Sequence, residues 1–132
     1  MTDGNEAIVV LVTAGSAESA EKIARALVEE RLAACVNVIP GIRSIYRWQG
    51  RVADDAEWLL VAKTGRSRFA ELEARVRALH SYEVPEVIML PVVGGAADYL
   101  AWIAAETDAA DPAAAGGSKP RSTPPARTRR RR

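Results

Sequence analysis

Three residues of this 132-residue chain have side chains that bind borderline or soft metal ions: His80, Glu83 and Cys35. A neutral imidazole suits Cu and Zn, and a thiolate is a soft ligand for the same metals. His80 and Glu83 are three residues apart, so both could bind one ion if the backbone between them stayed helical. Pro85 argues against a helix that continues beyond Val84. The pattern is therefore a weak signal for a divalent-metal site, with His80 as the best candidate ligand.

Each of these residues also has a structural interpretation. His80 follows an apolar helical stripe, and a helix C-terminus favours a cation. Cys35 lies in a strand-like run, and free cysteine is among the most buried residue types. Glu83 belongs with Tyr82 and Pro85 to a turn-like cluster, in which we expect the tyrosine hydroxyl to find a backbone partner. The same cluster could form the floor of a cleft between subunits, so both interpretations stay open.

The apolar pattern predicts an α+β fold. A continuous apolar run over residues 7–13 is typical of a strand that is buried on both faces. Ser16 then fits the N-cap of a helix whose apolar positions extend to Val28. Two strand-like segments follow, then a second helix, a strand over 87–93 and a helix over 97–106. The order β-α-β-β-α-β is a duplicated split βαβ unit, so we expect a ferredoxin-like fold with one extra C-terminal helix.

The two central strands form a long predicted hairpin, in which residues 33–48 pair with residues 52–64. Gln49-Gly50 fits the turn, because glycine readily supplies a positive φ, and Pro40-Gly41 marks a bulge or an edge. An arm of about fifteen residues spans roughly 50 Å, which is longer than a small domain is wide. We therefore expect an overhang that exposes several apolar side chains, namely Ile42, Ile45, Tyr46, Trp48 and Trp58. Long apolar edges are usually paired, which predicts a closed ring of subunits.

The formal net charge of +1 hides an acidic body and a basic tail. Residues 116–132 carry seven of the 18 Lys and Arg residues and no acid, which leaves 11 basic against 17 acidic residues before them. The tail has no periodic apolar face, so we expect a folded domain over 1–107 and a disordered Ala/Pro/Arg-rich segment over 108–132. Such a tail could bind nucleic acid or another anionic surface weakly, or it could serve only solubility.

The cysteine count and the length of the apolar runs indicate in which cellular compartment the protein is expected. Cys35 is the only cysteine, so no intrachain disulfide can form, which fits a reducing environment. The longest apolar run is too short to span a bilayer, and Met1–Glu6 lacks the basic start of a signal peptide. We expect a cytoplasmic protein without membrane insertion.

Several function classes that use this fold need features that the sequence lacks. RNA-recognition domains stack bases on exposed strand aromatics, whereas the only phenylalanine, Phe69, lies on a helical stripe. Small phosphatases need an anion cradle of backbone N–H groups, and no glycine-rich loop precedes the first helix. His80 is the only histidine, and nothing specific pairs with it in a Ser/His/Asp arrangement. The sequence therefore favours a protein that is not an enzyme.

Three stretches carry a resemblance to a known family: Ala33-Ala-Cys-Val-Asn-Val-Ile-Pro-Gly-Ile-Arg-Ser-Ile-Tyr-Arg-Trp-Gln-Gly50, His80-Ser-Tyr-Glu-Val-Pro-Glu86 and Tyr99-Leu-Ala-Trp-Ile103. Over about residues 7–106 the chain resembles the CutA family of divalent-ion tolerance proteins. The resemblance implies a ferredoxin-like fold and a tight homotrimer, similar in architecture to PII signalling proteins. It also implies a cytoplasmic location in bacteria and a link to tolerance of divalent metals, copper especially.

The metal ligands of that family are only partly kept. Members associated with copper binding carry a Cys in the first strand and a His-His pair before the Tyr motif, and these positions correspond here to Val12, Leu79 and His80. Only His80 remains of that set, although three copies around a trimer could still hold Cu or Zn. The alternative is a PII-like trimeric signalling or scaffold module that binds a small molecule or a protein partner between its subunits.

Overall fold

The computed structural model describes residues 6–108, so the tail predicted over 108–132 lies outside the described residues except for Asp108. The secondary-structure elements of the described range are β1 (Ala7–Ala14), α1 (Ala17–Glu29), β2 (Cys35–Trp48), β3 (Arg51–Gly65), α2 (Phe69–Leu79), β4 (Val87–Pro91) and α3 (Ala97–Glu106). A single 3-10 turn, Arg66–Arg68, leads into α2. The predicted α+β class and the predicted order of elements are confirmed.

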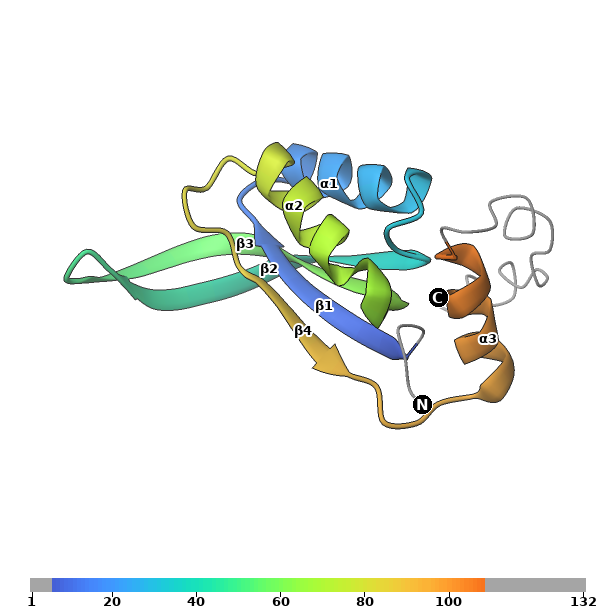
Figure 1. Ribbon diagram of the computed structural model, residues 1–132. Helices are drawn as coiled ribbons and strands as arrows, with labels where there is room; N and C mark the ends of the chain where they lie inside the picture. Colours follow the sequence, from blue (N-terminus) through green and yellow to red (C-terminus); the bar gives the residue numbers. More distant parts are fainter. Residues whose placement is uncertain (1–5, 109–132) are drawn as a thin grey trace.

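The four strands form one antiparallel sheet in the order β2-β3-β1-β4. Helices α1 and α2 lie together on one face of this sheet, and α3 lies at the end where β1 begins (Figure 1). Helix α3 contacts β3 and β1 there. The opposite face, which we call the open face, is therefore covered only in part.

The core lies between the sheet and helices α1 and α2. Ile8, Val10 and Val12 of β1 are fully buried on this side. Each such side chain stabilises the fold by about 1.5–3 kcal/mol relative to an exposed one. The alternate residues Val9 and Leu11 point to the open face and are only half-buried. The prediction that this strand is buried on both faces is therefore wrong, because both large helices pack on the same side of the sheet.

The long hairpin has the predicted turn and bulge. Gln49 and Gly50 have φ of +51° and +78° and close the turn between Trp48 and Arg51. Gly41 has φ of +79°, and the register of β2 against β3 shifts between Ile39 and Ile42. Glycine tolerates this left-handed backbone without the clash that a Cβ would cause.

The hairpin projects beyond the body of the molecule (Figure 1), which leaves Ile45 63% and Val52 66% exposed. Tyr46 and Trp48 are exposed as predicted. Trp58 is not exposed, because it lies beneath the helices and packs against the core. Ile42, at the base of the overhang, is half-buried.

The sheet ends on two outer strands, β2 and β4. Strand β4 stops at Pro91 rather than at residue 93, because the last ladder pair is Ile8 with Pro91. Beyond it, the Val92 N–H donates to the carbonyl of Ala7 at 3.2 Å. None of the helices described for this chain is long and apolar enough to cross a membrane.

Candidate functional site

The loop between α2 and β4, residues 80–86, meets the C-terminal end of β1 and places His80 there. His80 ends α2, and its backbone N–H donates to the carbonyl of Val76. Its ring Nε2 lies 2.7 Å from the carbonyl oxygen of Thr13, and the Tyr82 N–H donates to its Nδ1 at 3.1 Å. A carbonyl oxygen can only accept, so Nε2 donates to Thr13, while Nδ1 accepts the N–H of Tyr82. Both ring nitrogens of His80 are thus already used within the chain.

Tyr82 connects this loop to the sheet. Its hydroxyl donates to Oε2 of Glu57 at 2.5 Å, and its ring stacks obliquely on that of His80. Glu57 is only 6% exposed. Burial first, and then the hydrogen bond to Glu57, raise the pKa of Tyr82 well above its usual range. Tyr82 is therefore a permanent donor rather than a base. The predicted backbone partner is wrong, because the buried carboxylate of β3 is within reach and accepts more strongly.

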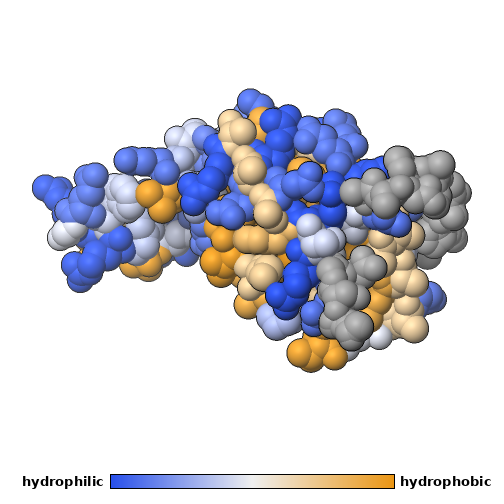
Figure 2. All heavy atoms as spheres, viewed as in Figure 1, coloured by the Kyte–Doolittle hydropathy of each residue, from blue (hydrophilic) through white to orange (hydrophobic). Residues whose placement is uncertain are grey.

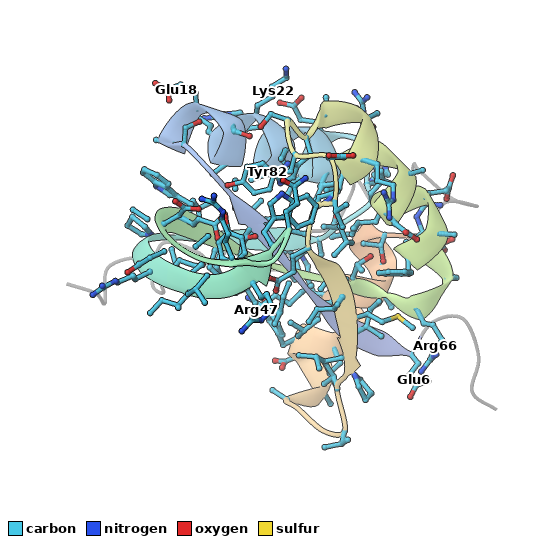
Figure 3. The ribbon with its side chains drawn as sticks, turned by 90° about the vertical axis from the view of Figure 1, so that its left-hand side faces the viewer. Glu6, Glu18, Lys22, Arg47, Arg66 and Tyr82 are labelled. Carbon is cyan, nitrogen blue, oxygen red and sulfur yellow. The ribbon has the colours of Figure 1, made fainter. Side chains whose placement is uncertain are left out.

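Gly15 allows Tyr82 to pass the end of β1. A Cβ atom at position 15 would lie only 2.8 Å from the Tyr82 hydroxyl oxygen, which is closer than real Cβ contacts. The close approach, and not an unusual backbone conformation, is what requires a glycine here. Tyr82 lies between α1 and the β2–β3 hairpin (Figure 3).

A pocket of about 420 Å³ opens beside Tyr82. It is lined by Gly15, Ser16, Ser19, Asp55, Ala56, Ser81 and Tyr82. Ser16 caps α1 as predicted, with its side chain accepting the Ser19 N–H at 3.1 Å. Asp55 accepts a hydrogen bond from the Tyr46 hydroxyl at 2.5 Å, and this bond raises the pKa of Tyr46. Hydroxyl groups and one carboxylate thus line the pocket, which suits hydrogen bonding to a small polar molecule.

A further carboxylate, Glu86, lies near this cluster. Partial burial, and second the negative charge of Glu57, raise the pKa of Glu86. Glu57 and Glu86 therefore repel each other at neutral pH. Tyr82 is the donor that offsets the buried charge of Glu57.

The structure separates the three predicted metal ligands. Glu83 is exposed in the same loop as His80. Cys35, at the start of β2, lies opposite Lys63, and Lys63 pairs with Val9 of β1. His80 instead contacts Thr13, which is four residues further along β1, so Cys35 and His80 lie at different ends of that strand. Within residues 6–108, no three His, Cys, Asp or Glu side chains are grouped so that they could hold one metal ion. The predicted ligands do not meet in one site within a chain.

Sequence reasoning missed Glu57, Asp55 and Gly15. Glu57 and Asp55 stand two residues apart at the outer part of β3, and their contacts with Tyr82 and Tyr46 depend on the sheet register and on the loop path. One signal was available. Glu57 immediately precedes the apolar segment Trp58–Ala62, and a charged residue at the boundary of a buried strand needs a partner.

Comparisons with known proteins identify the family of this chain. The family model described as CutA1 divalent ion tolerance protein matches residues 8–106. The divalent-cation tolerance protein CutA of Thermus thermophilus is 56% identical over 99 residues, which cover 75% of this chain and 96% of that protein. The chain belongs to the CutA1 divalent ion tolerance family. The resemblance seen in the sequence is thereby confirmed.

Solved structures of the CutA1 family have the same fold. The Thermus thermophilus protein aligns with a TM-score of 0.72 over 74% of this chain and 94% of that chain. CutA of Xylella fastidiosa is 42% identical and aligns with a TM-score of 0.76 over 78% of this chain and 99% of that chain. The chain spans about half the length of some eukaryotic CutA relatives, such as 53% of the chloroplastic Arabidopsis thaliana protein, which is 50% identical over 96 residues.

Proposed function

We propose that the protein acts in divalent-cation tolerance as a cytoplasmic, non-catalytic homotrimer of ferredoxin-like subunits that binds a divalent cation, Cu or Zn. Membership of the CutA1 family over residues 8–106 carries this proposal. The described site is compatible with a binding role, because hydrogen bonds hold the Tyr82 hydroxyl and the His80 ring in place.

The assembly part of the proposal is supported by exposed apolar side chains on the hairpin and on an outer strand. Ile45 and Val52 on the hairpin, and Ile88 and Leu90 on β4, are 45–66% exposed in a single chain. Hydrophobic side chains also gather on the surface over β4 and the segment after it (Figure 2). Exposed apolar strands of this kind are normally covered by another chain.

His80 is the first ligand to test. Its Nδ1 could bind a metal only if the Tyr82 N–H moved away, so metal binding would compete with the hydrogen bond that orders the loop. Glu83 is close in sequence and exposed, so the same movement could bring it to the ion. Cys35 lies elsewhere on the chain and would have to contribute to a site shared between subunits. A threefold assembly would supply three copies of each ligand.

The test is calorimetric titration of Cu(II) and Zn(II) into the metal-free full chain and two variants. His80→Ala removes the ligand and the two hydrogen bonds. His80→Gln removes the imidazole but keeps one donor for the Thr13 carbonyl and one acceptor for the Tyr82 N–H. We expect micromolar or tighter binding that both variants lose, while His80→Gln keeps the native fold by circular dichroism. Absence of heat in the wild-type chain with both metals would contradict the cation-binding proposal.

A second candidate function is favoured by the pocket beside Tyr82. Its hydroxyl-rich lining suits a PII-like module that binds a small polar metabolite or a protein partner. A ligand that binds only the folded state raises its melting temperature. The discriminating measurement is a thermal-shift screen of metabolites with a chelator present. A hit that Ser81→Ala weakens would favour this alternative over metal binding.

A further inference from the structure

Three groups on the wall of the pocket beside Tyr82 can still accept a hydrogen bond. They are Oδ1 of Asp55 and the hydroxyls of Ser19 and Ser81, none of which has a partner among residues 6–108. Asp55 uses only its other oxygen, Oδ2, which accepts from the Tyr46 hydroxyl. This bond orients the carboxylate and leaves Oδ1 available. The pocket therefore offers one negative charge and two hydroxyl oxygens to a ligand.

The described part of the chain brings no cation to balance this charge. Within residues 6–108, Asp55 forms no ion pair, and no Lys, Arg or His side chain lines the pocket. Lys22 of α1 points away from Tyr82 (Figure 3). The adjacent Asp54 is different, because Arg43 binds both of its oxygens at 2.9 and 2.7 Å. Of these two neighbouring acids, only the one outside the pocket has a cationic partner in the described range.

A second carboxylate, next to Tyr82, also lacks a positive partner. Glu57 is only 6% exposed, yet within residues 6–108 it forms no ion pair and its Oε1 has no hydrogen-bond partner. Its partner in that range is the hydroxyl of Tyr82, a residue that lines the pocket. A buried carboxylate without a cation is costly, so a positive charge nearby would stabilise it.

The kind of cation follows from the groups that surround it. Among residues 6–108, no three His, Cys, Asp or Glu side chains are grouped to hold a metal ion, so the carboxylates are not arranged as metal ligands. An ammonium group carries several N–H donors, which suits a pocket that combines a carboxylate with hydroxyl oxygens. A volume of about 420 Å³ leaves room for a short chain beyond the ammonium.

We propose that this pocket binds a small primary amine, with its ammonium group on Asp55 and its further polar contacts to the hydroxyls of Ser19 and Ser81. The inference rests on the second candidate function above, because it names the ligand class of the same pocket. A charge-assisted hydrogen bond to Asp55 is the strongest single contact that the lining offers, so charge selects the ligand. The nearby charge of Glu57 attracts a cation and repels an anion.

The proposed assembly uses other side chains than the pocket does. The apolar side chains assigned above to contacts between subunits do not line the pocket; they are Ile45, Val52, Ile88 and Leu90. Ile45 pairs with Asp54, so Asp55 lies on the opposite face of the hairpin from Ile45, since side chains alternate along a strand. The measurement is therefore made on the full chain in the assembly that it forms in solution.

The two neighbouring acids give a matched pair of variants. Asp55→Asn removes the charge in the pocket but keeps an oxygen for the Tyr46 hydroxyl. Asp54→Asn removes the same charge one residue away, on the other face of the hairpin and outside the pocket. Both acids are exposed, so neither change disturbs the core. Circular dichroism checks the fold of each variant.

The experiment is a ligand-observed NMR titration at pH 7 with a chelator present, so the result does not depend on metal binding. The probes are 4-aminobutanol, 1,4-butanediol and 4-hydroxybutyrate, which share a hydroxyl end and differ in the charge of the other end. We expect only the amine to bind. Asp55→Asn should weaken it about tenfold or more, because a hydrogen bond to a charged group is lost. Asp54→Asn should bind it as the wild type does.

A primary ammonium can also come from a lysine side chain of a partner protein. Nα-acetyl-lysine methylamide is the probe for this source, because its only charge is the side-chain ammonium. If it binds more tightly than 4-aminobutanol and loses this binding in Asp55→Asn, the ammonium site is supported and a protein lysine is its source.

Three results would overturn the proposal. Equal binding of the amine and the diol, or a preference for hydroxybutyrate, would mean that the pocket does not select positive charge, although a ligand-binding module would remain. Amine binding that Asp55→Asn leaves unchanged would place the amine elsewhere on the chain. Binding of none of the four compounds would remove both the amine site and its support for the second candidate function, whereas the metal titration could still succeed.

Discussion

At the scale of single residues, Gly15→Ala is the smallest substitution that we expect to disturb the candidate site. The methyl group of Gly15→Ala would meet the Tyr82 hydroxyl at 2.8 Å and push it from Glu57. The buried Glu57 carboxylate would lose its donor, and a hydrogen bond to a charged group contributes about 1.5–3 kcal/mol. We expect a destabilisation of that order in urea unfolding at pH 7.

The matched control for this substitution is Gly94→Ala, because a Cβ at position 94 meets nothing within 4 Å. Tyr82→Phe should cost a similar amount as Gly15→Ala, because both remove the same hydrogen bond from Glu57. In the Tyr82→Phe background, Gly15→Ala should therefore cost clearly less than it does alone. Full additivity of the two costs would mean that Gly15 does not act through Tyr82.

Glu86 gives a residue-scale prediction about pH. Its pKa is raised in the fold above the ordinary value of 4.5, first by partial burial and then by Glu57. A raised carboxyl pKa means that the folded state binds the proton more tightly than the unfolded state, so ionisation of Glu86 opposes folding. Glu86→Gln should be more stable than the wild type at neutral pH, and this gain should disappear as the pH falls to about 4.5 and below. Urea unfolding from pH 4 to 8 measures it, with Glu83→Gln as the control for loss of one charge from the same loop.

At the scale of elements, the β2–β3 hairpin depends on its two-residue turn. Gly50 has φ of +78°, a conformation that costs a residue with a Cβ about 1–2 kcal/mol. Gly50→Ala should therefore lower the free energy of unfolding by about that amount, although a Cβ there would touch nothing within 4 Å. An unchanged unfolding midpoint would show that the turn adapts without strain.

The elements also show which features a sequence can predict. Gly41, Gly50 and Ser16 act through their own backbone or through a neighbour three residues away, so the bulge, the turn and the N-cap were predictable. The Tyr82–Glu57 bond joins residues 25 positions apart, and the Lys63–Cys35 contact joins residues 28 positions apart. Such contacts depend on strand register and loop path, which apolar periodicity does not encode. The half-covered second face of β1 was missed for a related reason, because the pattern cannot tell on which side two helices pack.

At the scale of the whole molecule, the basic tail remains a prediction about residues outside the described range. It could hold nucleic acid through phosphate contacts, which weaken steeply as salt rises. We expect the full chain to bind duplex DNA weakly at low salt and to lose this binding when Arg127 and Arg129–Arg132 are replaced by serine. Fluorescence anisotropy at two salt concentrations checks it. Equal binding by the serine variant would leave the tail without this role.

The proposed trimer is best tested with side chains that are exposed in a single chain, because their replacement leaves intrachain packing intact. Ile45 on the hairpin is 63% exposed, so Ile45→Lys should have little effect on the fold of one subunit. If the hairpin packs against another chain, a buried lysine there would oppose assembly.

We expect the wild type to sediment at about three times the chain mass of 14.2 kDa and Ile45→Lys to shift toward a single chain. Val28→Lys, at a site 41% exposed on α1, should leave the mass unchanged, because α1 covers the face of the sheet opposite the open face. A single-chain mass for the wild type would refute the trimer, and a trimer that Ile45→Lys leaves intact would move the interface from the hairpin to β4.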